Sequence, residues 1–330
     1  MSITDETIAV YPIEVETDLS KLQTFNFYLV KVADTLLLID AGYDNEVCWN
    51  SLQHTLKENG YSLTDLEAIL LTHHHHDHAG LVNRIVANHP QVRVFAHKDA
   101  IVRLRRDPQY LESRIEFFRY LYLQMGCSGA KVAKEIKRLR KFVIDNEKQI
   151  VGCNIETISE GDDLYHLKVL EVPGHSLDHV VFYHEQSKSL FAGDHLIEHI
   201  SSNAIIDIGK NGSRPRSLVM YEQSLQRLFD FAIETAYSGH GKLITEPYRL
   251  LEEKLKRINN KANIILQMLT EPQTAASIAQ KIYKERYDTL FPLVMSEIIG
   301  HIDRLEHYGE ITYTVQNNVN IYEKQLRPLL

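Results

Sequence analysis

The chain has 330 residues, 44% apolar and 24% charged, which is ordinary for a folded protein and enough for one large domain with a smaller one. Its net charge of −8 argues against a general nucleic-acid-binding surface, and no apolar run reaches the roughly 18 residues of a membrane helix. The start shows no secretion signal and the three cysteines are widely spaced, so we expect a cytoplasmic protein without disulfides or membrane contact.

Strand and helix patterns alternate over the first hundred residues. Apolar runs typical of buried strands occur at residues 25–32, 35–42, 66–72 and 92–97. Helix patterns that end near Gly60 and before Pro90 separate them, at residues 48–60 and 80–90. This alternation predicts an α/β layered domain.

Residues 98–148 interrupt the alternation and carry an excess of positive charge. Two helix patterns, at 101–126 and 130–142, are joined by a glycine-containing turn. Between Lys98 and Lys141, twelve Lys or Arg residues stand against five Asp or Glu residues. Such a run is usually a solvated helix face, and the alternative is that it attracts an anionic substrate. We expect a helical insertion that could cap a functional site.

Strand patterns resume at 154–159, 167–172 and 179–194, the last with a turn at 185–188. From residue 247 the chain becomes helical, and two strands around an Asn-Asn turn end it. Helix patterns lie at 248–270, 274–283 and 293–309. Three helices and a hairpin are the order of a winged helix, so we predict a catalytic domain over 1–246 and a winged-helix-like α+β domain over 247–330.

The third of these helix patterns would be the nucleic-acid recognition helix of a winged helix. It carries Glu297, Asp303 and Glu306 against a single Arg304. A helix that contacts phosphates would be expected to carry more Lys and Arg. We therefore expect the tail to serve packing or formation of a homodimer, with nucleic-acid binding as the disfavoured alternative.

The stretch LLTHHHHDHAG, residues 70–80, places five imidazoles and a carboxylate directly after an apolar strand. Its position inside the chain argues against a purification tag. Alternate residues of an extended backbone point to one side, which groups His73, His75 and Asp77; His78 begins the turn into the next helix. Imidazole and carboxylate suit zinc and similar divalent ions. The stretch predicts part of a metal site, and a surface cluster of histidines is the alternative.

Three further ligand-type residues follow apolar strands and lie beside glycine. His175 occurs in VLEVPGHSLDH, Asp194 in LFAGDHL and His240 in AYSGHG. Glycine lets the backbone turn sharply and approach a neighbouring group closely. These residues are candidates to complete the metal site.

The motifs H-x-H-x-D-H, PGHS, GD and GHG, in this order, resemble those of the metallo-β-lactamase superfamily. The resemblance covers about residues 8–245. It implies a four-layer αβ/βα sandwich that holds two divalent metal ions. The ligands it implies for one ion are His73, His75 and His175. Those for the other ion are Asp77, His78 and His240, and Asp194 would bridge the two ions.

The resemblance implies further roles near these ligands. His74 and His76 fall on variable positions of the motif and are not expected to bind metal. Asp40, in LLLIDAG, matches a supporting acid that would orient a histidine or a backbone amide, with a plain turn residue as the alternative. Asp77 is the candidate catalytic residue, to orient the nucleophile and move a proton, although a role as ligand alone stays open. We expect zinc, with iron or manganese as alternatives, because mixed nitrogen and oxygen ligands accept all three.

The predicted function is metal-dependent hydrolysis. Two cations that share a water lower its pKa toward neutrality and so provide a bridging hydroxide at pH 7. An aspartate at position 194 resembles glyoxalase II-like thioesterases, lactonases and phosphodiesterases, whereas many β-lactamases carry cysteine or histidine thereabouts. We therefore expect a small thioester, ester or lactone as substrate. The alternatives are a phosphodiesterase or endoribonuclease with the same two metal ions, and a metal-sensing regulator that binds DNA.

Other residues are candidates for contacts near the site. The insertion offers Tyr110, Arg114, Phe118, Tyr120, Tyr122 and Met125, although aromatic residues at helical spacing more often pack in a core. His195, His199 and Asn203 follow Asp194 and are expected near the mouth of the site. His179 and His184 are expected to support the ligands or to lie at the surface.

Overall fold

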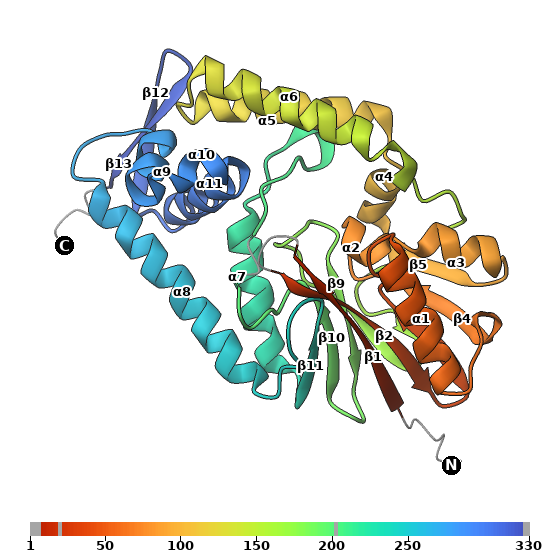
Figure 1. Ribbon diagram of the computed structural model, residues 1–330. Helices are drawn as coiled ribbons and strands as arrows, with labels where there is room; N and C mark the ends of the chain where they lie inside the picture. The colour runs from red at the N-terminus through yellow and green to blue at the C-terminus, as the bar shows by residue number, and fades with distance from the viewer. Residues whose placement is uncertain (1–7, 19–21, 201–203, 326–330) are drawn as a thin grey trace.

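Two β-sheets lie face to face at the centre of the larger part of the chain (Figure 1). They are seen in a computed structural model that describes residues 8–18, 22–200 and 204–325. The first sheet contains, in spatial order, β1 (Ile8–Thr17), β2 (Gln23–Val32), β3 (Thr35–Ile39), β4 (Leu66–Leu70), β5 (Arg93–His97) and β6 (Glu156–Ile158). β1, β2 and β3 pair antiparallel, and β3 to β6 pair parallel. The parallel strands are nearly continuous apolar runs because both of their faces are covered.

The second sheet is mainly antiparallel. In spatial order it contains β11 (Thr235–Ser238), β10 (Ser189–Gly193), β9 (Val180–His184), β8 (Leu167–Glu171) and β7 (Asp163–Leu164). The predicted turn at 185–188 joins β9 and β10, and β11 adds parallel to β10. The parallel pair brings the carboxyl ends of β10 and β11 to the same edge, where Asp194 and His240 follow.

Helices cover the outer face of each sheet. α1 (Glu46–Glu58) and α3 (Val82–Asn88) pack on the first sheet, while α7 (Ser217–Arg227) and α8 (Pro247–Met268) pack on the second. A separate apolar cluster, which includes Val30, Leu37, Phe182 and Phe191, fills the space between the sheets. The predicted α/β, four-layer αβ/βα sandwich is confirmed.

The insertion contains three α-helices where the sequence predicted two. They are α4 (Ile101–Leu104), α5 (Pro108–Gln124) and α6 (Gly129–Asp145). The expected helix 101–126 is broken because Arg106 adopts a positive φ of 51° and Pro108 begins a new helix. Asp107 caps that helix by accepting a hydrogen bond from the Tyr110 amide at 2.8 Å.

The C-terminal part follows the predicted order of helices and hairpin. Beyond α8 it contains α9 (Ala275–Tyr283), α10 (Arg286–Thr289), α11 (Phe291–His307), β12 (Ile311–Gln316) and β13 (Val319–Lys324). Asn317 and Asn318 both have positive φ, as the predicted two-residue hairpin turn requires. The winged-helix assignment and the boundary at residue 247 stay predictions.

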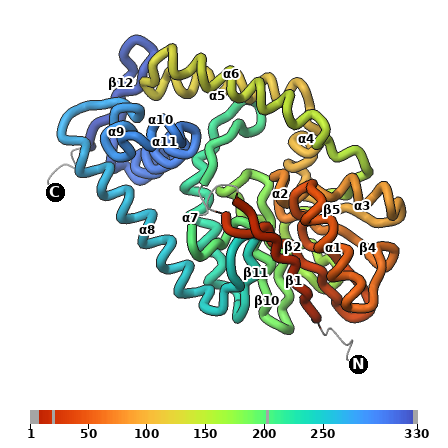
Figure 2. The backbone as a smooth tube through the Cα atoms, in the orientation of Figure 1, coloured from red at the N-terminus to blue at the C-terminus, as the bar shows by residue number. Residues whose placement is uncertain are grey.

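The insertion helices lie beside the C-terminal part of the chain (Figure 2), and the two segments share one hydrophobic core. Met125, Ile136 and Leu139 from the insertion join Ile278, Ile298 and Tyr322 in that cluster. Segments separated by more than a hundred residues therefore form one structural unit.

Helix α11 is mostly buried, so it does not present the open face of a recognition helix. Asp303 is 1% exposed and Arg304 7% exposed. The Arg304 guanidinium donates to both carboxylate oxygens of Glu222 in α7, at 2.7 and 2.8 Å, and to Asn259 Oδ1 in α8 at 2.6 Å. This buried ion pair fixes the C-terminal helices to the sandwich.

The sequence did not predict the strands β1 and β7 or the helices α7, α10 and the single-turn α2 (His76–Ala79). No helix within the described ranges is long and apolar enough to cross a bilayer.

Candidate metal centre

The predicted ligands come from four loops that meet at one edge of the sandwich. His73, His75, Asp77 and His78 lie between β4 and the start of α3. His175 lies between β8 and β9, Asp194 directly after β10, and His240 two residues after β11. Ligand atoms from these seven residues fall into two compact groups, each with all atoms within 4.8 Å of one another.

The first group contains His73, His75, His175 and Asp194. His75 Nδ1 lies 2.9 Å from His73 Nε2 and 3.1 Å from His175 Nε2. His175 Nε2 is 3.4 Å from Asp194 Oδ2. The ring nitrogens that face one another are therefore Nδ1 of His75 and Nε2 of the other two histidines.

The second group contains Asp77, His78 and His240. His240 Nε2 lies 3.4 Å from Asp77 Oδ2 and 3.2 Å from Asp194 Oδ1. His78 Nε2 is also 3.2 Å from Asp194 Oδ1. One oxygen of Asp194 thus faces the second group while the other faces His175 of the first.

Hydrogen bonds from the opposite ring nitrogens fix the orientation of three histidines. His78 Nδ1 donates to Asp40 Oδ2 at 2.7 Å, and His240 Nδ1 donates to the Thr24 carbonyl at 2.7 Å. The Thr72 hydroxyl donates to Asp40 and so accepts from His73 Nδ1 at 3.1 Å. With the proton on Nδ1, each ring presents its Nε2 lone pair to the centre, as a metal ligand must.

Asp40 is a buried hydrogen-bond acceptor, as the supporting role required. It is 3% exposed and also accepts the Thr72 amide at 2.8 Å. The sequence alone did not indicate Thr72 as the partner of Asp40 or Thr24 as the partner of His240, because threonine in or beside a strand is common and carries no metal signal.

The inward-facing atoms fit a cationic group. His78 Nε2, His240 Nε2 and Asp194 Oδ1 are buried and have no hydrogen-bond partner among the described residues. Buried polar atoms in proteins nearly always have a hydrogen-bond partner or a metal ion. Three buried polar atoms that face one another without a partner therefore indicate a site for a bound group. Nitrogen and carboxylate donors suit zinc, iron or manganese.

The electrostatics agree with this fit. Burial lowers the pKa of His73 and of His75 well below the ordinary value, so both rings are neutral, as metal ligation requires. Burial also acts to lower the pKa of His78, but the Asp40 and Asp194 carboxylates outweigh it and raise that pKa well above its usual range. The centre therefore favours positive charge next to Asp194.

His74, on a variable position of the motif, has a supporting contact, whereas the His76 ring lies beside Phe142 of the insertion, with 5.8 Å between centroids. The His74 ring donates from Nδ1 to Asp178 Oδ1 at 2.7 Å, and the His74 amide donates to Asp178 Oδ2 at 2.9 Å. Burial acts to raise the pKa of Asp178, but the charge and hydrogen bond of His74 hold it well below its usual range. Asp178 was missed in the sequence, although it lies in the same PGHSLDH segment as His175.

His179 supports Asp194 through the backbone. Its Nε2 accepts the Asp194 amide at 3.1 Å, and its ring stacks on His73 with 4.7 Å between centroids. Burial and the charge of His175 lower the pKa of His179 to about 3, so the ring is a neutral acceptor at physiological pH. His184 is buried too, but it bonds Ser187 in the β9–β10 turn, away from the ligands.

The candidate contacts on the insertion are mostly structural. Phe118, Tyr122 and Met125 lie in the shared core with α9 and α11, and Tyr120 is exposed. Tyr110 and Arg114 both bond Asp207, at 3.1 and 2.6 Å.

The residues after Asp194 differ in their surroundings. His195 is fully buried beside Tyr221, with 5.2 Å between ring centroids, whereas His199 is exposed. Asn203 lies outside the described residues.

Comparisons with known proteins agree with this architecture. A family model described as the Metallo-beta-lactamase superfamily matches residues 25–240. The Bacillus subtilis protein named "Probable metallo-hydrolase YqjP" is 33% identical over 307 residues, which cover 91% of this chain and 93% of that protein. An atrochrysone carboxyl ACP thioesterase of Pseudocercospora fijiensis is 24% identical over 74% of this chain and 56% of its own length.

Solved structures show the same arrangement over nearly the whole chain. A metallo-beta-lactamase family protein of Thermus thermophilus has a TM-score of 0.77 and 26% identity, covering 96% of this chain and 98% of its own. The similarity therefore extends through the insertion and the C-terminal part.

Proposed function

The chain belongs to the metallo-beta-lactamase superfamily of hydrolases, and from that premise we propose that it is a dinuclear metal-dependent hydrolase of a small thioester, ester or lactone. His73, His75 and His175 would hold one ion. Asp77, His78 and His240 would hold the other, with Asp194 between them.

The position of Asp194 carries this proposal. Its two oxygens point to different ligand groups, at 3.2 Å from His78 and His240 and at 3.4 Å from His175. A carboxylate so placed can bridge two cations, which a site for a single ion would not need. Aspartate at this position is also the feature by which the chain resembles glyoxalase II-like thioesterases.

Two divalent cations bound in such a site generate a nucleophile from water near neutral pH and polarise the carbonyl that it attacks. The chain's own residues supply orientation and proton handling. Asp77 is partly exposed, with its side chain 20% accessible, so it can contact both the centre and a substrate. We assign to it the orientation of the attacking water and the acceptance of its proton. Asp40 and Thr72 hold the His78 and His73 rings in place.

The relative that is named a thioesterase favours a thioester over the other substrates. The phosphodiesterase or endoribonuclease alternative rested on the basic insertion. Much of its charge is neutralised within the protein, in ion pairs that include Arg114–Asp207, Arg138–Glu135 and Arg140–Glu112. The DNA-binding regulator is disfavoured because α11, its recognition helix, is mostly buried.

The proposal is tested by screening zinc-loaded protein against thioesters, lactones, phosphodiesters and RNA, with Asp194→Ala as control. We expect thioester hydrolysis that Asp194→Ala reduces by about a hundredfold or more while the fold, followed by circular dichroism, is kept. Hydrolysis that persists in Asp194→Ala would assign the activity to another site. Cleavage of RNA or a phosphodiester alone would favour the alternative.

A further inference from the structure

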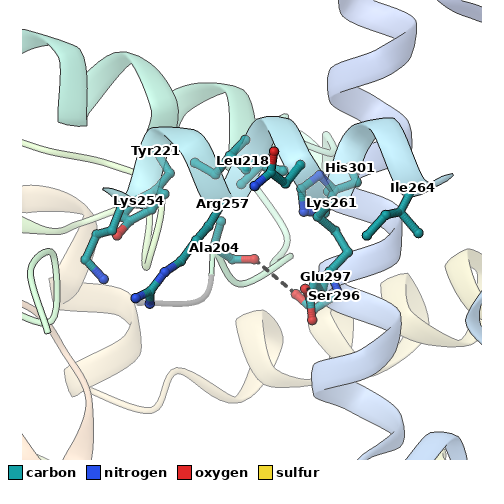
Figure 3. A pocket seen from close by; sticks show the side chains of 13 residues that line it. Ala204, Leu218, Tyr221, Lys254, Arg257, Lys261, Ile264, Ser296, Glu297 and His301 are labelled. Carbon is teal, nitrogen blue, oxygen red and sulfur yellow. Dashed lines mark hydrogen bonds and ion pairs between the residues drawn. The ribbon is translucent and has the colours of Figure 1, made fainter. Parts of the chain in front are cut away.

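A cavity of about 330 Å³ lies between α7, α8 and α11 (Figure 3). We call it the α8 pocket. Its cationic lining comes from successive turns of α8, as Lys254, Arg257 and Lys261 are spaced by three and four residues on one helix face. Leu218, Ile258 and Ile264 supply apolar walls.

The positive charge of the α8 pocket is only partly balanced. Lys261 pairs with Glu297 at 3.4 Å, and Arg257 makes one ion pair with Glu253 at 3.5 Å. Lys254 is 4% exposed, and among the described residues its ammonium donates to a carbonyl, that of Ile200 at 3.3 Å, with no carboxylate within 4.0 Å. A buried ammonium without a counter-charge is costly, and a bound anion would remove that cost.

A second, independent group points to a ligand. His301 of α11 also lines the α8 pocket, is 4% exposed, and its Nδ1 has no hydrogen-bond partner among the described residues. Burial and the charge of Lys261 lower the pKa of His301 to about 3, so the ring is neutral and can donate one hydrogen bond. Figure 3 shows His301 beside Lys261. An anion in the α8 pocket could therefore contact the Lys254 ammonium and accept a hydrogen bond from the His301 ring.

The α8 pocket adjoins the metal centre through Tyr221 and Lys254. Tyr221 lines the pocket, and its hydroxyl donates to the carbonyl of His195, the residue after Asp194, at 2.9 Å. Burial and Arg257 lower the pKa of Lys254 to about 7, and the Asp194 carboxylate acts in the opposite direction. A residue that lines the α8 pocket is therefore bonded to the loop that carries Asp194.

We propose that the α8 pocket binds a carboxylate or phosphate group carried by the substrate, away from the bond that is hydrolysed. Lys254 is the inner contact, Arg257 the contact at the mouth, and the apolar walls hold the short segment between the anion and the reacting carbonyl. The substrate class is then an anionic acyl thioester or ester. This inference rests on the proposed function.

The test compares matched thioesters that differ in charge. We would measure kcat/KM for butanoyl-pantetheine and butanoyl-phosphopantetheine, and for butanoyl thioesters of 3-mercaptopropionate and of its methyl ester. The phosphate and carboxylate pairs separate the two sources of the anion. Wild-type protein is expected to prefer one anionic partner by tenfold or more, and Lys254→Met to reduce that preference at least tenfold.

Controls separate binding from folding. Arg257→Met changes a side chain that is 56% exposed, so it should fold normally and reduce the preference two- to threefold. Lys256→Met removes an exposed charge from the same helix outside the α8 pocket and should change nothing.

Each outcome decides one of the two proposals. Equal kcat/KM for charged and neutral thioesters, or an equal loss of both in Lys254→Met, would overturn the proposal that the α8 pocket binds an anion. The proposed hydrolase function would be unaffected by that result. If zinc-loaded protein hydrolyses none of these thioesters and no ester or lactone, the proposed function fails. Calorimetry then decides the pocket by itself, with S-methyl-phosphopantetheine against S-methyl-pantetheine and S-methyl-3-mercaptopropionate against its methyl ester. Preferential binding of an anionic compound in either pair supports the proposal, and equal or no binding in both pairs overturns it.

Discussion

Replacing Asp40 by asparagine tests how the protein holds the second ligand group. Asp40 is buried, and its two oxygens accept from the Thr72 amide, the Thr72 hydroxyl and His78 Nδ1 at 2.7–2.8 Å. Its backbone has a positive φ of 58°, a conformation that asparagine also tolerates. The substitution therefore keeps the shape of the side chain and removes its charge.

The expected loss follows from these hydrogen bonds. An asparagine side chain has one accepting oxygen, so its amide group must face either the Thr72 donors or the His78 N–H. A buried donor then loses its acceptor, and a hydrogen bond to a charged group is worth about 1.5–3 kcal/mol. Loss of a partner that orients a metal ligand typically weakens metal affinity by about 10–100-fold. We expect the Kd of the second ion, held with His78, to rise by that factor.

The assay is a zinc titration in competition with a chromophoric chelator, which resolves two dissociation constants in the wild-type protein. Asp34→Asn is the matched control, because Asp34 is exposed in the turn between β2 and β3. Unchanged affinity of both ions in Asp40→Asn would refute the reasoning. So would weakening of the ion held by His73 and His75 alone.

Three further predictions follow from other contacts. Arg304→Met leaves the buried Glu222 carboxylate without its partner, so it should lower the free energy of unfolding, measured by urea titration, by about 3–5 kcal/mol. Adding Glu222→Gln to the same chain should partly reverse this loss. Burial raises the pKa of Asp303 to about 6. The stability that its protonated form contributes is therefore fully present below about pH 4 and is lost as the pH rises through 6. Asp303→Asn should raise the free energy of unfolding at pH 7.5 by up to about 3 kcal/mol and leave it unchanged at pH 4. Gly239→Ala would place a methyl group 2.5 Å from Asp194 Oδ1, so displaced ligands should lower turnover by about a hundredfold, and normal turnover would contradict the geometry.

Local patterns were sufficient to predict the layered core and to find the residues of the centre. Runs such as 35–42 and 66–72 are apolar on both faces, which is the pattern of buried parallel strands. His175, Asp194 and His240 each follow such a strand beside glycine, and the structure brings them together with His73 and His78. The role of a short motif after a strand can be predicted because the strand itself fixes where the next side chains point.

Contacts between distant segments could not be predicted in the same way. Asp178 looks like an ordinary loop acid until the fold places it against His74. The insertion is expected to cap the site because it interrupts the alternation of strands and helices, but Phe118 and Tyr122 pack into a core completed by α9 and α11. The same holds for Arg304, whose partner Glu222 lies in the unpredicted helix α7. Spacing identifies an amphipathic face but carries no information on what covers it.

The most direct test of the account is a metal titration of turnover. Protein stripped with a chelator is supplied with zinc in small steps while thioester hydrolysis and bound zinc per chain are measured together. The account predicts no turnover by the stripped protein and a rise that ends at two zinc ions per chain, because His73, His75 and His175 and, separately, Asp77, His78 and His240 form two groups around Asp194. Full turnover at one ion per chain, or turnover that does not depend on metal, would contradict it.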